Sequence, residues 1–526
     1  MKRSFFAIAI LPWLLFACGN RNTIADRTLD ASREMTLSEP VPAVEEPEPN
    51  TEGYAAIQEN SFVTALHQPL STFSVDVDKA SYSNMRRFLN NGRLPPAGAV
   101  RIEEMINYFD YDYKKPEDGK PFSVVTEVAG CPWNESHKLV HIGLKGREIE
   151  QTGLPPSNLV FLVDVSGSME AEDKLPLLKR SLLLLVDKLS DEDRVSIVAY
   201  AGNAGLVLPS TSGAEKSTIR EAIENLEAGG STAGGAGIVL AYKEARKHFM
   251  QQGNNRIIIA TDGDFNVGLS SEDELVRLVE KERESGVFLS VLGLGTGNYQ
   301  DSKMQQLADK GNGNHYYIDG IAEARKVLVK EFSGTLFTIA KDVKIQVEFN
   351  PAKVQAYRLI GYENRMLNKE DFNDDKKDAG EIGSGHTVTA LYEIIPAGVT
   401  DDLVKSVDEL KYQDEPGETK ATDHSGELLT IKLRYKAPQS DVSEKIIVPV
   451  MDGNESWKST SDNFRFSAAV AEFGLLLRNS EYKQKASYTQ VLAIAKGATG
   501  DDENGYRSEF GTLVTKASDL AKADKE

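Results

Sequence analysis

The stretch SNLVFLVDVSGSMEAEDK, residues 157–174, decides the fold. It begins with the apolar run LVFLV, which Asp164 closes and which is typical of a strand buried on both faces. The chain then turns directly into two serines spaced two residues apart, Ser166 and Ser168. A buried strand that ends in a carboxylate and two hydroxyls predicts a polar site: a nucleophile, a phosphate-binding turn or a metal site.

Strands and helices alternate from Ser157 to about Gly334. The expected strands are NLVFLVD, RVSIVAY, GLVLP, NRIIIATD, VFLSVLGLG and NHYYID, and the expected helices are KLPLLKRSLLLLVDKL, EKSTIREAIENL, GIVLAYKEARKHFMQ, EDELVRLVEKERES and DSKMQQLADKG. This alternation predicts an α/β fold with a doubly wound, mostly parallel sheet. In such sheets ligands bind outside the carboxyl ends of the strands.

Polar side chains occur where three of these segments end. Asp164, Ser166 and Ser168 follow the first strand, Thr232 lies in the loop GGSTAGG before a helix, and Asp262 closes the strand IIIAT. Because the carboxyl ends of parallel strands meet at one edge, these oxygen atoms are expected to converge. A site built only from oxygen ligands suits Mg²⁺, or Mn²⁺ or Ca²⁺, far better than zinc.

The motif DVSGS, the threonine of GGSTAGG and the aspartate of TDGD resemble, in that order, the metal-ion-dependent adhesion site of the von Willebrand factor type A (VWA) domain. The resemblance implies that Ser166 and Ser168 bind the metal through their hydroxyls. It also implies that Thr232 coordinates directly or through water, and that Asp164 and Asp262 act through water and hydrogen bonds. The metal would then keep a position open for a carboxylate from a protein partner.

Other roles for the same residues are open on sequence alone. A nucleophilic serine requires G-x-S-x-G, which the surroundings of Ser166 lack, although a triad is defined by geometry. The glycine-rich stretch GDFNVGLS, residues 263–270, has Leu269 where a phosphate loop has lysine, which argues against nucleotide binding. Each residue taken singly would also serve as a turn or helix cap, but their conjunction favours a metal site.

The first eighteen residues predict an export signal. Two basic residues precede a short apolar stretch that ends at Phe16, too short for a membrane-spanning helix. The ending LFAC resembles the lipobox of bacterial lipoproteins, in which the cysteine, here Cys18, is acylated. A protein that is lipid-anchored in the bacterial cell envelope is therefore expected, with cleavage of an ordinary secretory peptide after Ala17 as the alternative.

Composition narrows the class of protein further. The formal charge of −20 argues against nucleic acid as a partner, because phosphate binding requires clustered Lys and Arg. The chain has two cysteines, so a lipidated Cys18 leaves Cys131 without an intramolecular partner and predicts that no disulfide framework stabilises the fold. Stability is therefore expected to come from large hydrophobic cores.

Strand-like segments occur on both sides of the α/β segment. They predict that the α/β domain is inserted in a β-sandwich-like region or is flanked by one. The predicted organisation is a signal peptide (1–18), a disordered acidic stalk rich in Pro and Glu (19–60), a small N-terminal helical unit (61–118), β strands (119–154), the VWA domain (155–336), a β-rich domain (337–455) and a C-terminal helical region (456–526).

These features together predict a binding protein of the cell envelope and not an enzyme. A VWA domain would dock the Asp or Glu of a protein partner through a divalent cation, and no nucleotide is expected. The alternative is an assembly or chaperone-like subunit of an envelope complex, in which the metal is structural. A serine hydrolase is the less favoured third reading, because no complete catalytic set is evident in the sequence.

Overall fold

The computed structural model describes residues 50–523, apart from residues 118, 378 and 454 and the ranges 150–154, 231–233, 264–271, 332–336 and 405–425. The segment Pro49–Glu526 forms one compact unit. The predicted signal peptide, Cys18 and residues 19–49 of the predicted stalk lie outside the described residues. Among the residues that are described, no helix is both long and apolar enough to span a bilayer.

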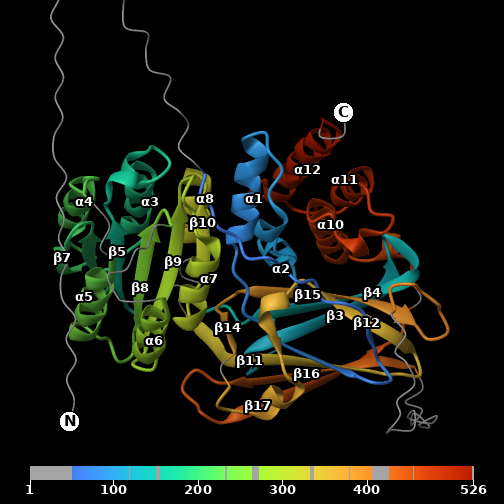
Figure 1. The fold of residues 1–526 in the computed structure, drawn as a ribbon. Coiled ribbons are helices and arrows are strands. Elements are labelled where there is room, and N and C mark those ends of the chain that lie inside the picture. Colours follow the sequence, from blue (N-terminus) through green and yellow to red (C-terminus); the bar gives the residue numbers. More distant parts are fainter. Residues whose placement is uncertain are drawn as a thin grey trace, which may run out of the picture. The chain divides into compact units, whose positions relative to one another are not determined.

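The α/β segment folds, within the described ranges, around a six-stranded sheet in the order β10-β9-β8-β5-β6-β7 (Figure 1). Its strands are β5 (Ser157–Asp164), β6 (Arg194–Tyr200), β7 (Ala204–Ser212), β8 (Asn254–Thr261), β9 (Val287–Leu294) and β10 (His315–Ile318). Its helices are α3 (Leu175–Val186), α4 (Lys216–Glu224), α5 (Gly234–Lys247), α6 (Glu272–Arg283), α7 (Asp301–Lys310) and α8 (Ile321–Arg325). Strand β7 runs antiparallel to β6 and the other neighbours pair in parallel, which confirms the predicted fold class.

Helices cover both faces of this sheet. Leu178 of α3, Ile219 of α4 and Ala324 of α8 belong to the core on one face. Ile238 of α5 and Met304 of α7 belong to the core on the other face. All positions of β5 are buried as a result, which explains its continuous apolar sequence.

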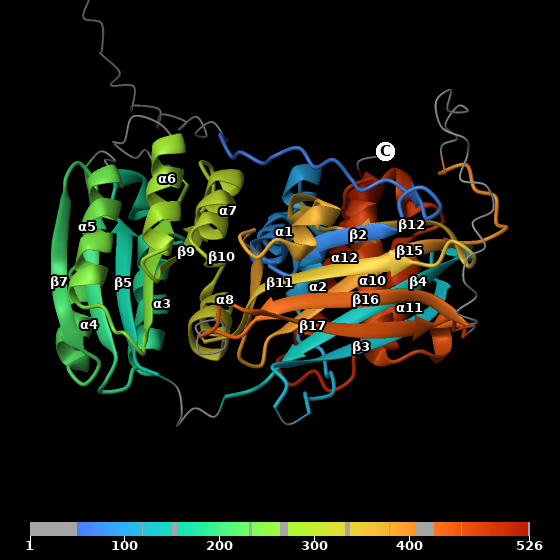
Figure 2. The ribbon, with the colours of Figure 1, turned by 90° about the horizontal axis from the view of Figure 1, so that it is seen from below.

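Two further sheets form a sandwich with a shared core (Figure 2). The first contains β1 (Val63–Thr64), β12 (Val354–Ile360), β15 (Thr387–Pro396), β4 (Asn134–Gly146) and β3 (Phe122–Cys131), in that order. The second contains β13 (Met366–Leu367), β2 (Leu70–Ser74), β11 (Thr338–Phe349), β16 (Glu427–Lys436) and β17 (Ser443–Met451), and β14 (Gly380–Gly383) also pairs with β11. This sandwich is called the body below.

The α/β domain is inserted into the body. Strand β2 precedes the insertion and pairs antiparallel with β11, which follows it, so that Phe73 lies opposite Ile345. Strand β4 pairs in the same way with β15, where His141 lies opposite Leu391. Strands from both sides of the insertion therefore complete one sandwich, as the sequence predicted.

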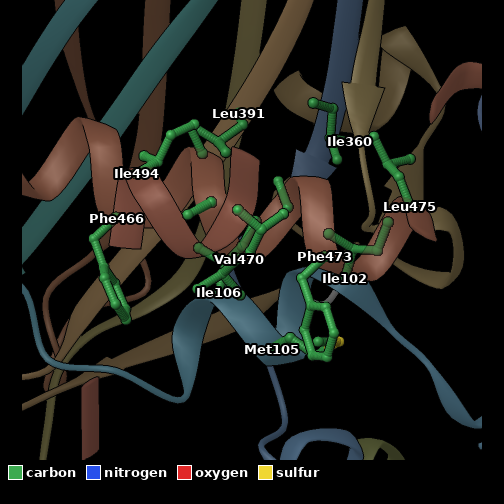
Figure 3. Close-up of a cluster of buried hydrophobic side chains, with 14 of the residues drawn as sticks. Ile102, Met105, Ile106, Ile360, Leu391, Phe466, Val470, Phe473, Leu475 and Ile494 are labelled. Atoms are coloured by element: carbon green, nitrogen blue, oxygen red, sulfur yellow. The ribbon is translucent and has the colours of Figure 1, made fainter. Parts of the chain in front are cut away.

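A layer of helices covers the outer face of the first sheet. It contains α1 (Ala80–Asn90), α2 (Ile102–Asn107), α10 (Asp462–Leu477), α11 (Tyr488–Lys496) and α12 (Tyr506–Ala523). Phe466 and Phe473 of α10 belong to one hydrophobic cluster with Met105 of α2 and Leu391 of β15, and Figure 3 shows Phe473 beside Met105. The N- and C-terminal helical regions, predicted as separate units, thus share one hydrophobic core, because neither could bury its apolar face alone.

Short helical turns complete the described elements. Turns of 3₁₀ helix cover Ala97–Ala99, Gly167–Glu170, Glu363–Arg365, Lys369–Asn373, Trp457–Ser459 and Glu481–Lys483, and a π-helical turn covers Lys326–Glu331. Serine caps start two of the C-terminal helices. The hydroxyl of Ser461 accepts from the backbone N–H of Phe464 at 3.1 Å, and that of Ser487 accepts from Gln490 at 3.2 Å.

Buried arginines join the inserted domain to the helical layer. Arg101 forms an ion pair with Asp301, the first residue of α7. Arg86 of α1 forms ion pairs with Asp319 at 2.6 Å and with Glu323 of α8 at 2.7 Å. Both guanidinium groups are almost fully buried, so the carboxylates stabilise their charge in place of water.

The first described residues contradict one predicted boundary. Residues 50–60 were assigned to the disordered stalk, but Glu52 forms an ion pair with Arg87 at 2.7 Å and accepts a hydrogen bond from the N–H of Gly297 at 3.0 Å. The backbone N–H of Thr51 also donates to the carbonyl of Gly297 at 2.6 Å. The ion pair holds this segment against α1 and the hydrogen bonds to Gly297 hold it against the inserted domain, contacts that composition alone does not reveal.

Glu472 in α10 gives the folded protein a predictable pH dependence. Its side chain is fully buried, and burial raises its pKa to about 7 from an ordinary value of 4.5, while the N–H of Ser487 at 3.0 Å partly opposes the rise. A carboxyl group whose pKa is raised in the folded state stabilises the folded protein at low pH, and this stabilisation is lost as the pH rises through 7.

Glu472→Gln is therefore expected to be more stable than the parent protein by about 2–3 kcal/mol at pH 8, and the stabilities of the two proteins should become similar near pH 5.

Chemical unfolding across this pH range measures the effect. Glu481→Gln, at an exposed position, serves as the matched control and should follow the parent curve. A constant difference between Glu472→Gln and the parent protein at all pH values would contradict the assignment.

Candidate metal centre

Two adjacent parallel strands place two aspartates at the same edge of the sheet. Asp164 is the last residue of β5, and Asp262 directly follows β8, whose residue Ala260 pairs with Val163. Both carboxylates have no exposed surface. The predicted convergence of these two residues therefore follows from the register of β5 and β8.

The turn after β5 is organised by Asp164. Its Oδ1 accepts a hydrogen bond from the N–H of Ser166 at 2.9 Å, and its Oδ2 accepts from the hydroxyl of Thr261 at 3.3 Å. The next loop is tied to this turn, because the N–H of Gly167 donates to the carbonyl of Gly230 at 3.1 Å. Thr232, two residues beyond Gly230, lies outside the described residues, so its place in the site stays a prediction.

The two serines lie together at this edge. The hydroxyl oxygens of Ser166 and Ser168 are 3.0 Å apart. Ser166 is buried, whereas Ser168 is exposed to solvent. The site therefore has a closed side formed by the carboxylates and an open side at Ser168, where a ligand from solution has access.

The two carboxylates have opposite electrostatic environments. Burial and the nearby charge of Asp262 raise the pKa of Asp164 to about 6, against hydrogen bonds from Ser166 that favour its ionised form. Burial alone would also raise the pKa of Asp262, but the hydrogen bond and charge of Lys174, with hydrogen bonds from Asn298 and Ser168, lower it below its ordinary value. The site thus contains one well-compensated carboxylate and one that gains from an added cation.

Lys174 is a residue of the candidate site that the sequence analysis did not identify. Its Nζ lies 2.9 Å from Oδ2 of Asp262 and 3.5 Å from Oδ1 of Asn298, and its side chain is buried. The stem packs on Gly295, where an added Cβ would lie 2.4 Å from carbon atoms of Lys174. Lys174 closes the same stretch that carries the serines, yet no local pattern reveals that it contacts a residue 88 positions away.

These donors fit a hard divalent cation. Two hydroxyls and two carboxylates supply oxygen only, the ligand type that Mg²⁺ and its relatives prefer. Within the described ranges, no group of three or more His, Cys, Asp or Glu side chains is placed to hold a metal ion. Any cation at this edge would therefore depend on the serine hydroxyls, as the sequence motif implies.

Three histidines of the described ranges have structural partners elsewhere in the fold. His137 and His141 lie on β4, where Nδ1 of His137 is 2.6 Å from Glu393 and Nε2 of His141 is 2.9 Å from the hydroxyl of Tyr113. His315 contacts the hydroxyl of Tyr299 at 2.9 Å. None of these contacts supplies a base to Ser166, which disfavours the serine hydrolase interpretation.

Sequence profiles of known families match three parts of the chain. The profile of the von Willebrand factor type A domain matches residues 158–330, which include the candidate site. A profile described as von Willebrand factor matches residues 48–141. A profile described as the C-terminal part of the uncharacterized protein YfbK matches residues 334–520.

Individual proteins resemble the chain over different lengths. The uncharacterized protein YfbK of Escherichia coli (strain K12) is 45% identical over 476 residues, which cover 89% of this chain and 81% of that protein. The uncharacterized protein sll0103 of Synechocystis is 29% identical over 37% of this chain and 45% of its own length. Human inter-alpha-trypsin inhibitor heavy chain H3 is 28% identical over 32% of this chain and 20% of its own length.

Two solved structures of bacterial proteins were also found as similar to parts of the chain. The von Willebrand factor type A protein of Catenulispora acidiphila is 14% identical and covers 86% of this chain and 91% of its own, with a TM-score of 0.38. The hypothetical protein BatB of Bacteroides thetaiotaomicron is 23% identical and covers 34% of this chain and 97% of its own, with a TM-score of 0.29.

Replacing Lys174 tests the electrostatic description of the site. In Lys174→Met the buried carboxylate of Asp262 loses its ammonium partner, so the metal-free protein is expected to be less stable by about 2–4 kcal/mol. Urea unfolding in the presence of a chelator measures this loss. Lys188→Met, just beyond the same helix and exposed, is the control and should leave stability unchanged; an equal stability of both variants would contradict the role given to Lys174.

Proposed function

This chain belongs to the same family as the Escherichia coli protein YfbK, and from that premise we propose that it is a cell-envelope binding protein. Its VWA domain docks a protein partner through a divalent cation, Mg²⁺ or a similar ion, held by Asp164, Ser166, Ser168, Thr232 and Asp262. The cation supplies an electrophilic position for an Asp or Glu carboxylate of the partner.

The convergence of Asp164, Ser166, Ser168 and Asp262 at the carboxyl edge of the sheet carries this proposal. The two hydroxyls are 3.0 Å apart, and the carboxylates behind them are fully buried. Neutral hydroxyls neutralise a cation only in part, so the ion keeps a strong preference for an additional anionic ligand. Because Ser168 is exposed, that ligand can arrive from outside the protein.

Lys174 limits how strongly the site attracts a cation. Its ammonium group already compensates Asp262, so an arriving divalent ion meets a positive charge close to its binding position. Repulsion between like charges in a buried site weakens metal binding. We therefore infer a site of moderate affinity, in which the carboxylate of the partner contributes part of the total binding free energy.

The envelope location is proposed from the N-terminal sequence. The basic start, the short apolar stretch and the lipobox-like LFAC ending support export and acylation of Cys18. The acidic segment that follows would act as a spacer between the anchor and the body. An assembly subunit with a structural metal is the alternative, and it differs from docking in whether the partner depends on the ion.

Removing Asp164 tests the metal site. Asp164→Asn keeps an acceptor for the N–H of Ser166 but removes the charge, so the fold should persist while the response to Mg²⁺ is lost. Saturating Mg²⁺ is expected to stabilise the parent protein by about 1–3 kcal/mol, and Asp164→Asn by much less. Calorimetric titration measures the Mg²⁺ affinity, and thermal unfolding measures the stabilisation by Mg²⁺. Glu172→Ala, at an exposed position in the same loop, is the control and should behave like the parent protein. An unchanged Mg²⁺ affinity in Asp164→Asn would refute the site.

Affinity capture from detergent-solubilised membranes tests the docking mechanism. Partners of the full-length chain should be lost when EDTA is present and restored when Mg²⁺ is added back. They should also be absent from captures with Asp164→Asn and present with Glu172→Ala. Partners that survive both EDTA and Asp164→Asn would overturn docking through the ion and favour the assembly role.

A further inference from the structure

A polar cavity lies at the edge of the VWA sheet opposite the metal centre, where the inserted domain meets the body. It has a volume of about 390 Å³ and is lined by residues of β8, of the loop after α7 and of β14. Figure 1 shows β14 beside α7 at this junction. Basic lining residues outnumber acidic ones by five to three, although the whole chain carries a formal charge of −20.

Arg256 of β8 is the unusual residue of this cavity. Its side chain is 3% exposed, and its Nη1 donates to the hydroxyl of Ser290 at 2.7 Å. Its Nε is buried with no hydrogen-bond partner among the described residues. Burial lowers the pKa of Arg256, and the charge of Glu381 only partly offsets this effect.

Other cations that line the cavity already have anionic or polar partners. Arg365 pairs with Asp309 and, at 2.9 Å, with Asp78. Lys310 pairs with Glu280 at 2.9 Å. Within the described part of the chain Arg256 forms no ion pair, and the charge of Glu381, which lines the same cavity, offsets the cost of its burial only in part. An added anion would therefore be favourable beside this guanidinium.

His386 adds a second donor to the same cavity. Its Nε2 is buried and has no hydrogen-bond partner among the described residues, and burial lowers its pKa to about 4. The ring is therefore neutral at physiological pH and can donate one N–H without adding charge. An Nε–H of Arg256 and a ring nitrogen of His386 therefore both lack partners among the residues that line one cavity, which indicates a missing acceptor.

We propose that this cavity binds a small oxyanion, a molecule whose carboxylate or phosphoryl group accepts hydrogen bonds from Arg256 and His386. A guanidinium presents two N–H groups in a plane and holds such groups in a bidentate manner. The size of the cavity suits a small organic molecule. Arg256 lies six residues before Asp262, which corresponds to about 20 Å along the strand, so this site is separate from the metal centre.

Inorganic phosphate and succinate are the probes for this site. Isothermal titration of the full-length chain should detect binding of at least one probe at millimolar concentration. Arg256→Met should weaken that binding at least tenfold, and Arg256→Lys should weaken it less, because it keeps the charge but loses the planar pair of donors. A response to phosphate alone or to succinate alone identifies the phosphoryl or the carboxylate group as the ligand.

Stability separates binding from a structural role of Arg256. Because Glu381 only partly offsets the cost of burying its charge, Arg256→Met should not lower the melting temperature in the absence of anions. Arg194→Met is the matched control, since Arg194 starts the nearby strand β6 and binds Ser210 at 2.7 Å outside the cavity; it should leave probe binding unchanged. The proposal would be overturned if neither probe binds, or if Arg256→Met and Arg256→Lys bind the probes as tightly as the parent protein does.

Discussion

The pairing of strands that are distant in the chain is the constraint on which the rest of the structure depends. β2 and β11 flank the inserted domain in sequence but lie side by side in one sheet, and β4 and β15 do the same in the other. This pairing brings the two ends of the insertion together and so restricts where the inserted domain can lie. Buried ion pairs then complete the junction, with Arg101 and Arg86 of the helical layer bound to carboxylates of the inserted domain.

Charge inside this acidic protein is arranged by pairing. Arg86, Arg101 and Arg365 are buried together with two or more carboxylates each, and Lys174 is buried against Asp262. A buried ion without a partner is costly, so these groups fix the junction and the metal edge in defined positions. Arg256 departs from this arrangement, which is why it indicates a ligand and its neighbours do not.

The parallel sheet separates the two candidate sites. All strands from β5 to β10 except β7 run in the same direction, so their carboxyl ends form one edge and their amino ends the other. Carboxylates and hydroxyls gather at the first edge, which suits a cation. A guanidinium and an imidazole line the cavity at the second edge, which suits an anion. Both sites therefore use the same strand β8, at its opposite ends.

The described structure confirms the predictions of secondary structure and fold that rest on local signals. The alternation of apolar strands with amphipathic helices predicted the VWA sheet, and the period-two strands on both sides predicted the insertion. Sequence-based prediction failed where a segment depends on distant residues. Residues 50–60 look like part of a stalk by composition, but Glu52 binds Arg87; the two helical regions look separate, but Phe473 and Met105 share one core.

The sequence by itself determined the order of the elements and the oxygen donors at the strand ends. Backbone periodicity and side-chain chemistry are properties of short segments, so they can be read without coordinates. Only the tertiary structure decided that Lys174 compensates Asp262 and that Arg256 is buried without an ion pair among the described residues. Both facts depend on which distant residues lie within a few ångströms of the charged group. For a buried charge, these neighbours decide whether it is stabilised.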